Sequence, residues 1–518
     1  MRHKAVRTLN PGLLLALILV AHPLSDSLAS AQARDTVASL RTRYNTVRTQ
    51  ANPQGDRKSE FDALEREIAR AARLGRTGEV RRLYTKGITL AQGNTWTPAL
   101  EFASSLALRT ERVFIDPRAP VAFRLEQIFL PSLELEAPLT VRVALHRPGG
   151  TAGAAGEKLK DVAAFDGVPR DLIDNPFRFD VDLSGVPDGR LLVRVETSSG
   201  TRPLATTTLN VQLHKGLDER LRRLESDAAR IKALEQLRAE ALYPGDYIRN
   251  VDRGRIGIGQ FNVEQELATA ERALASLLSG VDPFAGRTGD LKRHYVFEEA
   301  GEILPYRLYI PSTYKAERPY PLVIALHGNG GTENTFFDGF DRQLPMLAEQ
   351  RGYIVAAPLG YRIDGGYGYN NGSRAAEEAR KLQLSEKDVM NVLALLKQHY
   401  RIDDARIYLT GHSMGGSGTW YLGPRSSQIW AALAPFAGGV TIAAAPQIKD
   451  LPQFVVHGDA DATAPVQRSR DVVAELKRLG AEHRYVEVPG GTHGNVVAPN
   501  LPAMFDFFDR HRKRAGTN

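Results

Sequence analysis

The 518-residue sequence contains no cysteine. This absence excludes disulfide frameworks, thiolate zinc sites, iron–sulfur clusters and a cysteine nucleophile. Any covalent catalysis must therefore use another side chain.

Long apolar runs are scarce as well. The exception lies at the start, where the basic segment 2–7 precedes an apolar run from Leu13 to Ala21 and the small residues Ala29-Ser30-Ala31. This order is typical of a secretory signal peptide, and the run is shorter than the roughly 20 residues that a membrane span needs. We expect residues 1–31 to be removed. The mature chain, from about Gln32, is then periplasmic or extracellular and has no transmembrane segment.

The sequence also lacks a strong excess of one charge. Its 67 Lys and Arg residues face 60 Asp and Glu residues, a formal net charge of +7, and part of the surplus lies in the leader and in the C-terminal segment 510–514. So small and local a surplus argues against a nucleic-acid partner. The 12 histidines show no metal-ligand spacing such as His-x-x-x-His, so we expect neither a metal nor another cofactor.

Changes in residue pattern divide the rest of the chain into four regions. Apolar residues at helical spacing predict an N-terminal helical region over 32–110. Short alternating runs separated by Pro, Gly and Asp predict a small antiparallel β-sandwich over 111–215. Helical spacing returns in a connector over 216–284.

In the fourth region, 285–518, continuous apolar runs alternate with helical stretches. This pattern predicts an α/β domain with a mostly parallel sheet covered on both faces. One helix is expected to begin at the capping box Ser385-x-x-Asp388. Sheets of this kind carry their chemistry at the carboxyl ends of the strands.

The clearest motif is Gly411-His412-Ser413-Met414-Gly415-Gly416, between a predicted strand and a predicted helix. Gly-x-Ser-x-Gly in this context indicates a serine on a tight strand-to-helix turn, where its hydroxyl is accessible to a substrate carbonyl. Because a free serine is a weak nucleophile, the motif requires a base and an orienting carboxylate.

Both partners follow in the chain order Ser, Asp, His. His493, in a glycine-rich segment, is the candidate base that would accept the proton of Ser413 and return it to the leaving group. Two aspartates follow the apolar run 454–456. We favour Asp461 over Asp459, because Asp459 lies closer to the strand end and can accept N–H groups of the turn instead.

A glycine-rich segment, Leu326-His327-Gly328-Asn329-Gly330-Gly331, follows the first long apolar run. Its glycines allow the chain to approach the serine closely. The backbone N–H groups of Asn329 and Met414 are therefore the candidate oxyanion donors. The nearby histidines are interpreted as structural: His327, His412 and His457.

Residues from about 292 to 510 resemble α/β-hydrolases of the group that contains feruloyl-esterase-like and polyhydroxybutyrate-depolymerase-like carboxylesterases and prolyl-oligopeptidase-like predicted peptidases. The segments that carry the resemblance are 408–420, His457-Gly458-Asp459-Ala460-Asp461 and Thr492-His493-Gly494. It implies that Ser413 is the nucleophile, Asp461 the acid and His493 the base, with Asn329 and Met414 as oxyanion donors. The chain has neither the blade-length repeat of a propeller nor the cysteines common in secreted feruloyl esterases.

These observations predict a secreted serine hydrolase that cleaves carboxylic esters of a small molecule or a polymer through an acyl-enzyme. Two alternatives stay open: a serine peptidase of the prolyl-oligopeptidase type, and an envelope- or polymer-binding protein with a secondary hydrolase domain. The Tyr- and Gly-rich segment 359–371 either shapes the substrate pocket, with Arg362 meeting an anion, or packs on its own domain. Trp420 is expected in the core.

Overall fold

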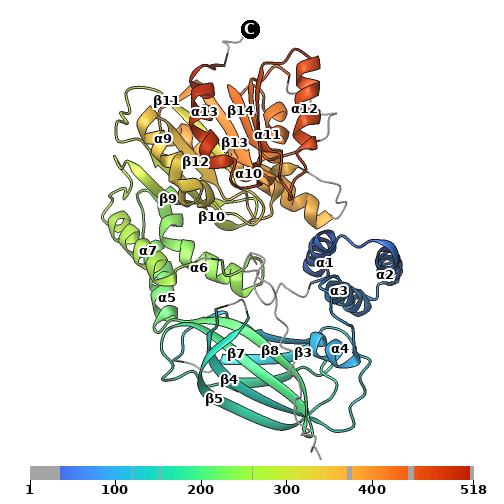
Figure 1. The fold of residues 1–518 in the computed structure, drawn as a ribbon. Helices are drawn as coiled ribbons and strands as arrows, with labels where there is room; N and C mark the ends of the chain where they lie inside the picture. The colour runs from blue at the N-terminus through green and yellow to red at the C-terminus, as the bar shows by residue number, and fades with distance from the viewer. Residues whose placement is uncertain are drawn as a thin grey trace, which may run out of the picture. The chain divides into compact units, whose positions relative to one another are not determined.

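The computed structural model describes residues 36–118, 121–150, 153–259, 261–369, 376–440 and 449–513. The predicted leader, residues 1–31, lies outside them. The chain divides into two compact units (Figure 1). The upstream unit runs to Lys215 and includes Val251–Gly259, and the C-terminal unit comprises Gly216–Asn250 and the chain from Gln260 onward. Within the described ranges no helix has the length and apolar character needed to cross a membrane.

The upstream unit begins with helices whose apolar faces meet in a shared core that includes Tyr44, Phe61 and Leu83. The hydroxyl of Thr97 caps the fourth helix by accepting the N–H of Leu100 at 3.2 Å. Residues 106–110 were expected to be helical but form a strand, paired antiparallel with residues 123–127. The helices are α1 (Val37–Ala51), α2 (Gly55–Arg73), α3 (Thr77–Ala91) and α4 (Pro98–Ser105).

Two sheets follow, with strand orders β1-β3-β6 and β2-β8-β7-β4-β5. Their pairings are antiparallel except for the short parallel pair β2 and β8. Alternate residues of both sheets bury their side chains in one common core, as in a β-sandwich. The strands are β1 (Leu106–Thr110), β2 (Phe114–Ile115), β3 (Val121–Gln127), β4 (Leu139–Pro148), β5 (Ala155–Val168), β6 (Phe177–Val181), β7 (Gly189–Ser199) and β8 (Arg202–Leu213).

The helices between the sandwich and the large sheet pack mainly on the C-terminal unit. Glu240 is buried, and its carboxylate accepts the Nε–H of Arg293 at 2.7 Å and lies 2.7 Å from Nδ1 of His294. Tyr243 stacks on His294 with ring centroids 4.0 Å apart. A buried charged network therefore joins the connector to the sheet. Its helices are α5 (Leu217–Ala228), η1 (Glu235–Leu237), α6 (Arg238–Asp252) and α7 (Val263–Leu278).

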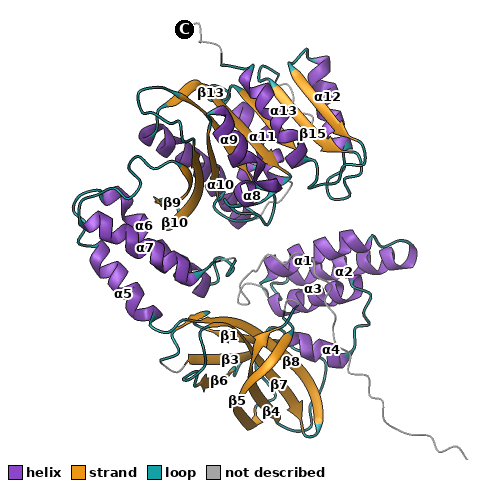
Figure 2. Ribbon diagram, turned by 60° about the vertical axis from the view of Figure 1, so that its left-hand side comes forward, coloured by secondary structure: helices purple, strands orange, loops and turns teal. Residues whose placement is uncertain are grey.

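The C-terminal unit is built on an eight-stranded sheet in the order β16-β15-β14-β13-β11-β12-β10-β9 (Figure 2). Its six strands from β16 to β12 are parallel, and β10 and β9 extend that edge antiparallel. The predicted α/β class with a mostly parallel sheet is thus confirmed. The strands are β9 (Gly289–Phe297), β10 (Glu302–Ile310), β11 (Tyr320–Leu326), β12 (Ile354–Pro358), β13 (Ile402–His412), β14 (Ala432–Phe436), β15 (Gln453–Gly458) and β16 (His483–Val488).

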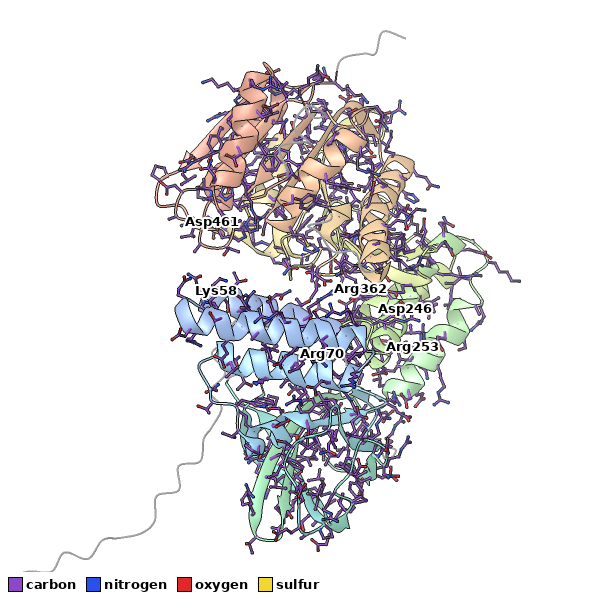
Figure 3. The ribbon with its side chains drawn as sticks, turned by 90° about the vertical axis from the view of Figure 1, so that its right-hand side faces the viewer. Lys58, Arg70, Asp246, Arg253, Arg362 and Asp461 are labelled. Atoms are coloured by element: carbon purple, nitrogen blue, oxygen red, sulfur yellow. The ribbon has the colours of Figure 1, made fainter. Side chains whose placement is uncertain are left out.

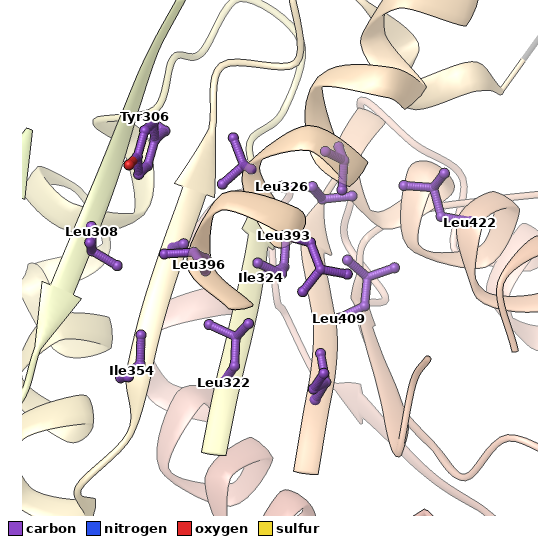
Figure 4. Close-up of a cluster of buried hydrophobic side chains, with 14 of the residues drawn as sticks. Tyr306, Leu308, Leu322, Ile324, Leu326, Ile354, Leu393, Leu396, Leu409 and Leu422 are labelled. Carbon is purple, nitrogen blue, oxygen red and sulfur yellow. The ribbon is translucent and has the colours of Figure 1, made fainter. Parts of the chain in front are cut away.

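Two apolar layers cover the faces of this sheet. On one face, side chains of α10 and α11 pack against residues of β10 to β13, including Leu322, Leu326 and Leu409 (Figure 4). On the other face, residues of α8, α9 and α13 pack against alternate positions of the same strands. The helices and short turns are α8 (Thr335–Asp338), η2 (Phe340–Arg342), α9 (Gln343–Arg351), η3 (Gly366–Gly368), α10 (Ala376–His399), α11 (Met414–Arg425), α12 (Gln467–Arg478) and α13 (Val497–Asp509).

The capping-box prediction was wrong, because α10 already begins at Ala376. Ser385 and Asp388 lie inside the helix with buried side chains. Both face a neighbouring loop, and their polar groups bond to that loop rather than to the start of their own helix.

Candidate active site

Ser413 joins the end of β13 to the start of α11 with φ 58° and ψ −113°. This is a strained backbone for a residue with a side chain. It is accommodated because the flanking glycines pass close to other backbone atoms. A Cβ on Gly411 would lie 2.3 Å from the carbonyl oxygen of Gly415, and one on Gly415 would lie 2.0 Å from that of Leu326. The Gly-x-Ser-x-Gly motif therefore follows from steric contact at this turn.

Three predicted residues meet in a linear chain of contacts. Oγ of Ser413 lies 2.8 Å from Nε2 of His493, and Nδ1 of the same ring lies 2.7 Å from Oδ2 of Asp461. A carboxylate can only accept, so Nδ1 carries the proton and Nε2 is free to accept the serine proton. The His493 side chain is 21 % exposed, whereas that of Asp461 is fully buried.

The carboxylate of Asp461 is held by several donors. Its Oδ1 accepts the backbone N–H groups of Thr463 and Ala464, each at 2.8 Å. Burial raises the pKa of this carboxyl, but the N–H of Ala464, the His493 ring and the N–H of Thr463 outweigh burial and lower the pKa below its ordinary value. Asp459 instead accepts the N–H of Gly490 at 2.7 Å. The structure thus brings Asp461, and not Asp459, to the imidazole.

His412 lies beside this chain and bonds to the segment that carries the candidate base. Its Nε2 lies 2.7 Å from the carbonyl oxygen of His493, and the two rings are 4.7 Å apart. Phe340 packs edge-on against His412 at 5.6 Å. Burial lowers the pKa of His412 to about 4, so the ring is neutral at physiological pH and its Nε2–H donates. This hydrogen bond fixes the backbone position of His493.

His457 braces the aspartate from the other side. Its Nε2 lies 3.2 Å from Oδ2 of Asp461 and 3.0 Å from the carbonyl oxygen of Ala464, while Nδ1 contacts the hydroxyl of Ser469 at 2.7 Å. Burial lowers the pKa of His457 as well. A neutral ring that donates from Nε2 and accepts from Ser469 satisfies all three neighbours.

The glycine-rich loop after β11 approaches the serine. A Cβ placed on Gly328 would lie 3.3 Å from Cβ of Ser413, so only glycine fits here without displacing its neighbours. Asn329 is exposed in the following turn, where the N–H of Gly330 donates to Ile363 at 2.8 Å. Met414 is the first residue of α11, and the first N–H groups of a helix lack intrahelical partners. Met414 therefore follows Ser413 directly in the chain, and Asn329 follows Gly328, the residue that approaches Ser413.

The loop after β12 is anchored from beneath by α10. Oγ of Ser385 accepts the N–H of Tyr367 at 3.0 Å, and Asp388 accepts the N–H of Tyr361 at 2.9 Å. Burial raises the pKa of Asp388 to about 6, although the hydroxyl of Tyr295, 2.6 Å away, opposes this rise. The loop is thus held by the buried side chains of Ser385 and Asp388. The sequence analysis interpreted these two residues as a capping box and did not connect them with the site.

Tyr367 continues this network to the glycine-rich loop after β11. Its fully buried ring fills the space beside α11, where a Cβ on Gly418 would lie 2.8 Å from a ring carbon. Its hydroxyl donates to the carbonyl oxygen of His327 at 3.3 Å, and Nε2 of His327 lies 2.6 Å from the carbonyl oxygen of Leu359. The sequence analysis placed Tyr367 in the segment 359–371, for which pocket-shaping and packing on its own domain were both open. The Tyr367 ring packs in the core of its domain.

The guanidinium of Arg362 is not available for a substrate anion, because it already pairs with a buried carboxylate. It makes two bonds to the Glu302 carboxylate, at 2.8 and 2.9 Å, and lies 3.8 Å from the ring centroid of Tyr361. Figure 3 labels Arg362 together with Asp461. Trp420 is fully buried and donates to Gln453 at 2.8 Å. Across the described ranges no group of three or more His, Asp or Glu side chains is arranged to hold a metal ion.

The sequence of the C-terminal unit is similar to that of known esterases. Residues 298–508 match the model of a family described as putative esterase. A bifunctional acetylxylan esterase/xylanase of Neocallimastix patriciarum is 28% identical over 32% of this chain and 22% of its own length. A probable feruloyl esterase C of Aspergillus flavus is 26% identical over 37% of this chain and 68% of its own length.

Among solved structures, a CE1 ferulic acid esterase of Anaeromyces mucronatus aligns with 43% of this chain and 90% of its own, at 20% identity and a TM-score of 0.36. The family match and the curated relatives confirm the resemblance of the C-terminal part to carboxylesterases. They also confirm the prediction that the chain carries a hydrolytic enzyme.

Proposed function

We propose that the C-terminal unit cleaves carboxylic esters with Ser413 as nucleophile, His493 as general base and acid, and Asp461 as the orienting carboxylate. The observation that carries this proposal is the pair of short distances through one imidazole, 2.8 Å to Ser413 and 2.7 Å to Asp461. Such a chain is what activates a serine hydroxyl that is otherwise a weak nucleophile.

The proposed reaction has two halves. Oγ of Ser413 attacks the ester carbonyl carbon while its proton passes to Nε2 of His493, and the resulting imidazolium protonates the alcohol oxygen as the C–O bond breaks. Water then attacks the acyl-enzyme, gives its proton to His493, and releases the acid as Ser413 regains its proton. Asp461 stays ionised throughout and stabilises the imidazolium.

Negative charge on the carbonyl oxygen would be stabilised by the backbone N–H groups of Met414 and Asn329. The start of α11 supports the first assignment, because the positive end of a helix dipole favours an oxyanion there. The close approach of Gly328 to Ser413 supports the second. Tyr367 and His412 serve as positioning residues, since they hold the oxyanion loop and the His493 segment through main-chain carbonyls.

Esters are favoured over peptides as substrates. The named relatives are esterases of acetylated xylan and feruloyl groups, and carboxylic ester cleavage is the chemistry that they share. The acyl group is left open by the site itself, so an acetyl ester, an aryl ester such as methyl ferulate and an acetylated polysaccharide are the three substrates to compare.

Replacement of Ser413 by Ala tests the proposal. Hydrolysis of p-nitrophenyl acetate should fall by at least about 10⁴-fold in kcat, and labelling by a fluorophosphonate should disappear. Ser426→Ala, at the half-buried residue that follows α11, is the matched control and should keep both activities. Undiminished hydrolysis by the Ser413 variant would exclude this nucleophile, and cleavage of peptides but not esters would favour the peptidase alternative.

We also propose that the chain is exported by means of residues 1–31. The proposal rests on the sequence order of basic, apolar and small residues before Gln32. Expression with the native start in a bacterium should yield a periplasmic or secreted protein whose first residue is Gln32. N-terminal sequencing checks this, and a mature protein that still begins at Met1 would contradict it.

A further inference from the structure

The upstream unit contains a cavity that is separate from the proposed active site. Its volume is 540 Å³, and it lies between the start of α3, the end of β3 and the segment that follows β3. This volume suits a small organic molecule. The cavity is complete within one unit, because all of its lining residues belong to that unit: Gly78, Glu79, Arg81, Glu126, Gln127, Ile128, Phe129, Leu130 and Ile173.

Apolar side chains form part of the wall and remain open to water. Leu130 is 71% exposed and is the most exposed large apolar side chain of the described ranges, and Ile173 is 39% exposed. Beneath them Ile128 and Phe129 are buried in a small cluster with Trp96. Two exposed apolar residues at the rim of one cavity leave apolar surface for a ligand to cover.

Arg81 supplies a charge that this unit does not neutralise. Other arginines whose buried Nε has no hydrogen-bond partner hold a carboxylate through another nitrogen: Arg48, Arg194 and Arg238. Arg81 is the exception, since no ion pair to it occurs in the part of the chain that the structure describes. Its Nη1 makes one long contact, 3.5 Å, to the carbonyl oxygen of Ile128.

The two carboxylates of the cavity are already engaged. Glu79 accepts two bonds from Arg82, at 2.7 and 2.8 Å, and the Arg82 guanidinium lowers the pKa of Glu79. Glu126 is bound by Arg109 at 2.9 Å and by Arg124 at 2.8 Å. The uncompensated charge in the cavity is therefore positive, and the first turn of α3, with its N-terminal dipole, adds to it.

We propose that this cavity binds a small organic carboxylate with an apolar body. The carboxylate would bond to the guanidinium of Arg81, whose planar fork suits two oxygen acceptors. The apolar body would cover Leu130 and Ile173. A carboxylate of this kind can be a free acid or a uronate of a polysaccharide. The apolar wall favours the free acid, because a sugar ring carries hydroxyls where the wall offers methyl groups.

Isothermal titration of the purified full chain tests this inference. Hexanoate and 3-phenylpropanoate are the probes. Hexanamide is the control that lacks the negative charge, and glucuronate is the control that keeps the carboxylate but has a polar body. Saturable binding of the two acids is expected, with hexanamide and glucuronate at least about tenfold weaker. Equal binding of hexanamide would overturn the role of charge, and preferential binding of glucuronate would overturn the role of the apolar wall.

Variants locate the binding site. Arg81→Gln and Leu130→Asn should each weaken hexanoate binding by at least about tenfold, while Arg66→Gln and Leu74→Asn, which make the same changes at exposed positions that do not line the cavity, should not. Far-UV circular dichroism and thermal unfolding of the upstream unit, measured in parallel, should be the same in all four and report that each is folded, and ester hydrolysis in the other unit should be unchanged. Absence of saturable binding, or binding that survives Arg81→Gln, would overturn the inference whatever the outcome for Ser413.

Discussion

The glycines of the two units stand in different surroundings. In the C-terminal unit a Cβ on Gly411, Gly415 or Gly458 would lie between 2.0 and 2.3 Å from a backbone oxygen. In the upstream unit Gly75, Gly150 and several others would meet nothing within 4 Å. The tightest contact of the upstream unit is with a side chain, since a Cβ on Gly87 would lie 2.5 Å from the Tyr44 ring, and the C-terminal unit also has open glycines such as Gly480. What sets the C-terminal unit apart is therefore close contact between backbones at some of its glycines. Close contact between backbones requires glycine at fixed positions, and these glycines form a recognisable sequence motif. Packing by alternating apolar side chains can be met by many residue types, so only the periodicity of apolar residues is visible in the sequence.

The largest expected effect separates the two units at the level of folding. A chain that begins at Ala285 loses Glu240 and Tyr243, so Arg293 and His294 lose their carboxylate and the edge of the sheet is uncovered. We expect this fragment to be insoluble. A chain that begins at Gly216 should be soluble and hydrolyse p-nitrophenyl acetate at nearly the full rate. Equal behaviour of the two fragments, measured by solubility and kcat, would break the division into units at Lys215.

The next prediction compares two aspartates of the C-terminal unit, Asp461 beside the imidazole and Asp459 in the adjacent turn. Asp461→Asn should lower kcat by about 10⁴-fold, because the amide stabilises the wrong imidazole tautomer. Asp459→Asn should change kcat by less than tenfold, since its bond to the N–H of Gly490 survives through the amide oxygen. Steady-state kinetics on one ester decide between them. A larger loss in the Asp459 variant would reverse the assignment of the acid.

A third experiment compares glycines across the units. Gly415→Ala should lower kcat by at least about 100-fold and reduce the thermal unfolding temperature, because its Cβ cannot coexist with the carbonyl oxygen of Leu326. Gly150→Ala, in open space, should alter neither quantity. Calorimetry and ester hydrolysis on both variants suffice. If the Gly150 variant were destabilised to the same degree, the contrast between the units would fail.

The smallest expected effect concerns pH. Burial raises the pKa of Asp388 to about 6, above that of the same carboxyl in the unfolded chain. The free energy of unfolding is therefore highest below about pH 4, falls as the pH rises from 4 to 6, and stays at the lower value above pH 6. The charges around it are few: Tyr295 donates to it, and Glu333 adds to the rise. Relative to Asp388→Asn, the wild type should therefore gain roughly 3 kcal/mol between pH 7 and pH 4. Urea unfolding at several pH values measures this, and parallel pH profiles of the two proteins would contradict the shift.

The same contrast explains what the sequence could and could not predict. The turn at Ser413 was predictable because its glycines have no substitute, and the strand and helix around it follow from continuous apolar runs. Asp461 and Asp459 differ by two positions, and only the backbone N–H groups of Thr463, Ala464 and Gly490 separate their roles. No spacing rule contains that information.

Other residues were hidden because their partners are distant in the sequence. Ser385 and Asp388 have the spacing of a helix start, yet they lie inside α10 and bind a loop about 20 residues earlier. Strand β5 carries exposed Glu157, Lys158 and Lys160, so its polar face concealed the strand period. Tertiary contacts decided each case against the local pattern.

The bond between Glu240 and strand β9 has a consequence for the behaviour of the chain in crowded solution. β9 is the outermost strand of the large sheet, and the backbone N–H of His294 donates to Oε1 of Glu240 at 3.2 Å. A side chain of the connector therefore occupies a group that another polypeptide would need for edge-to-edge association, and Arg293 adds a charge at the same border. We expect the connector to disfavour edge-to-edge association of this sheet, in a protein that has no cysteine with which to close that edge by a disulfide.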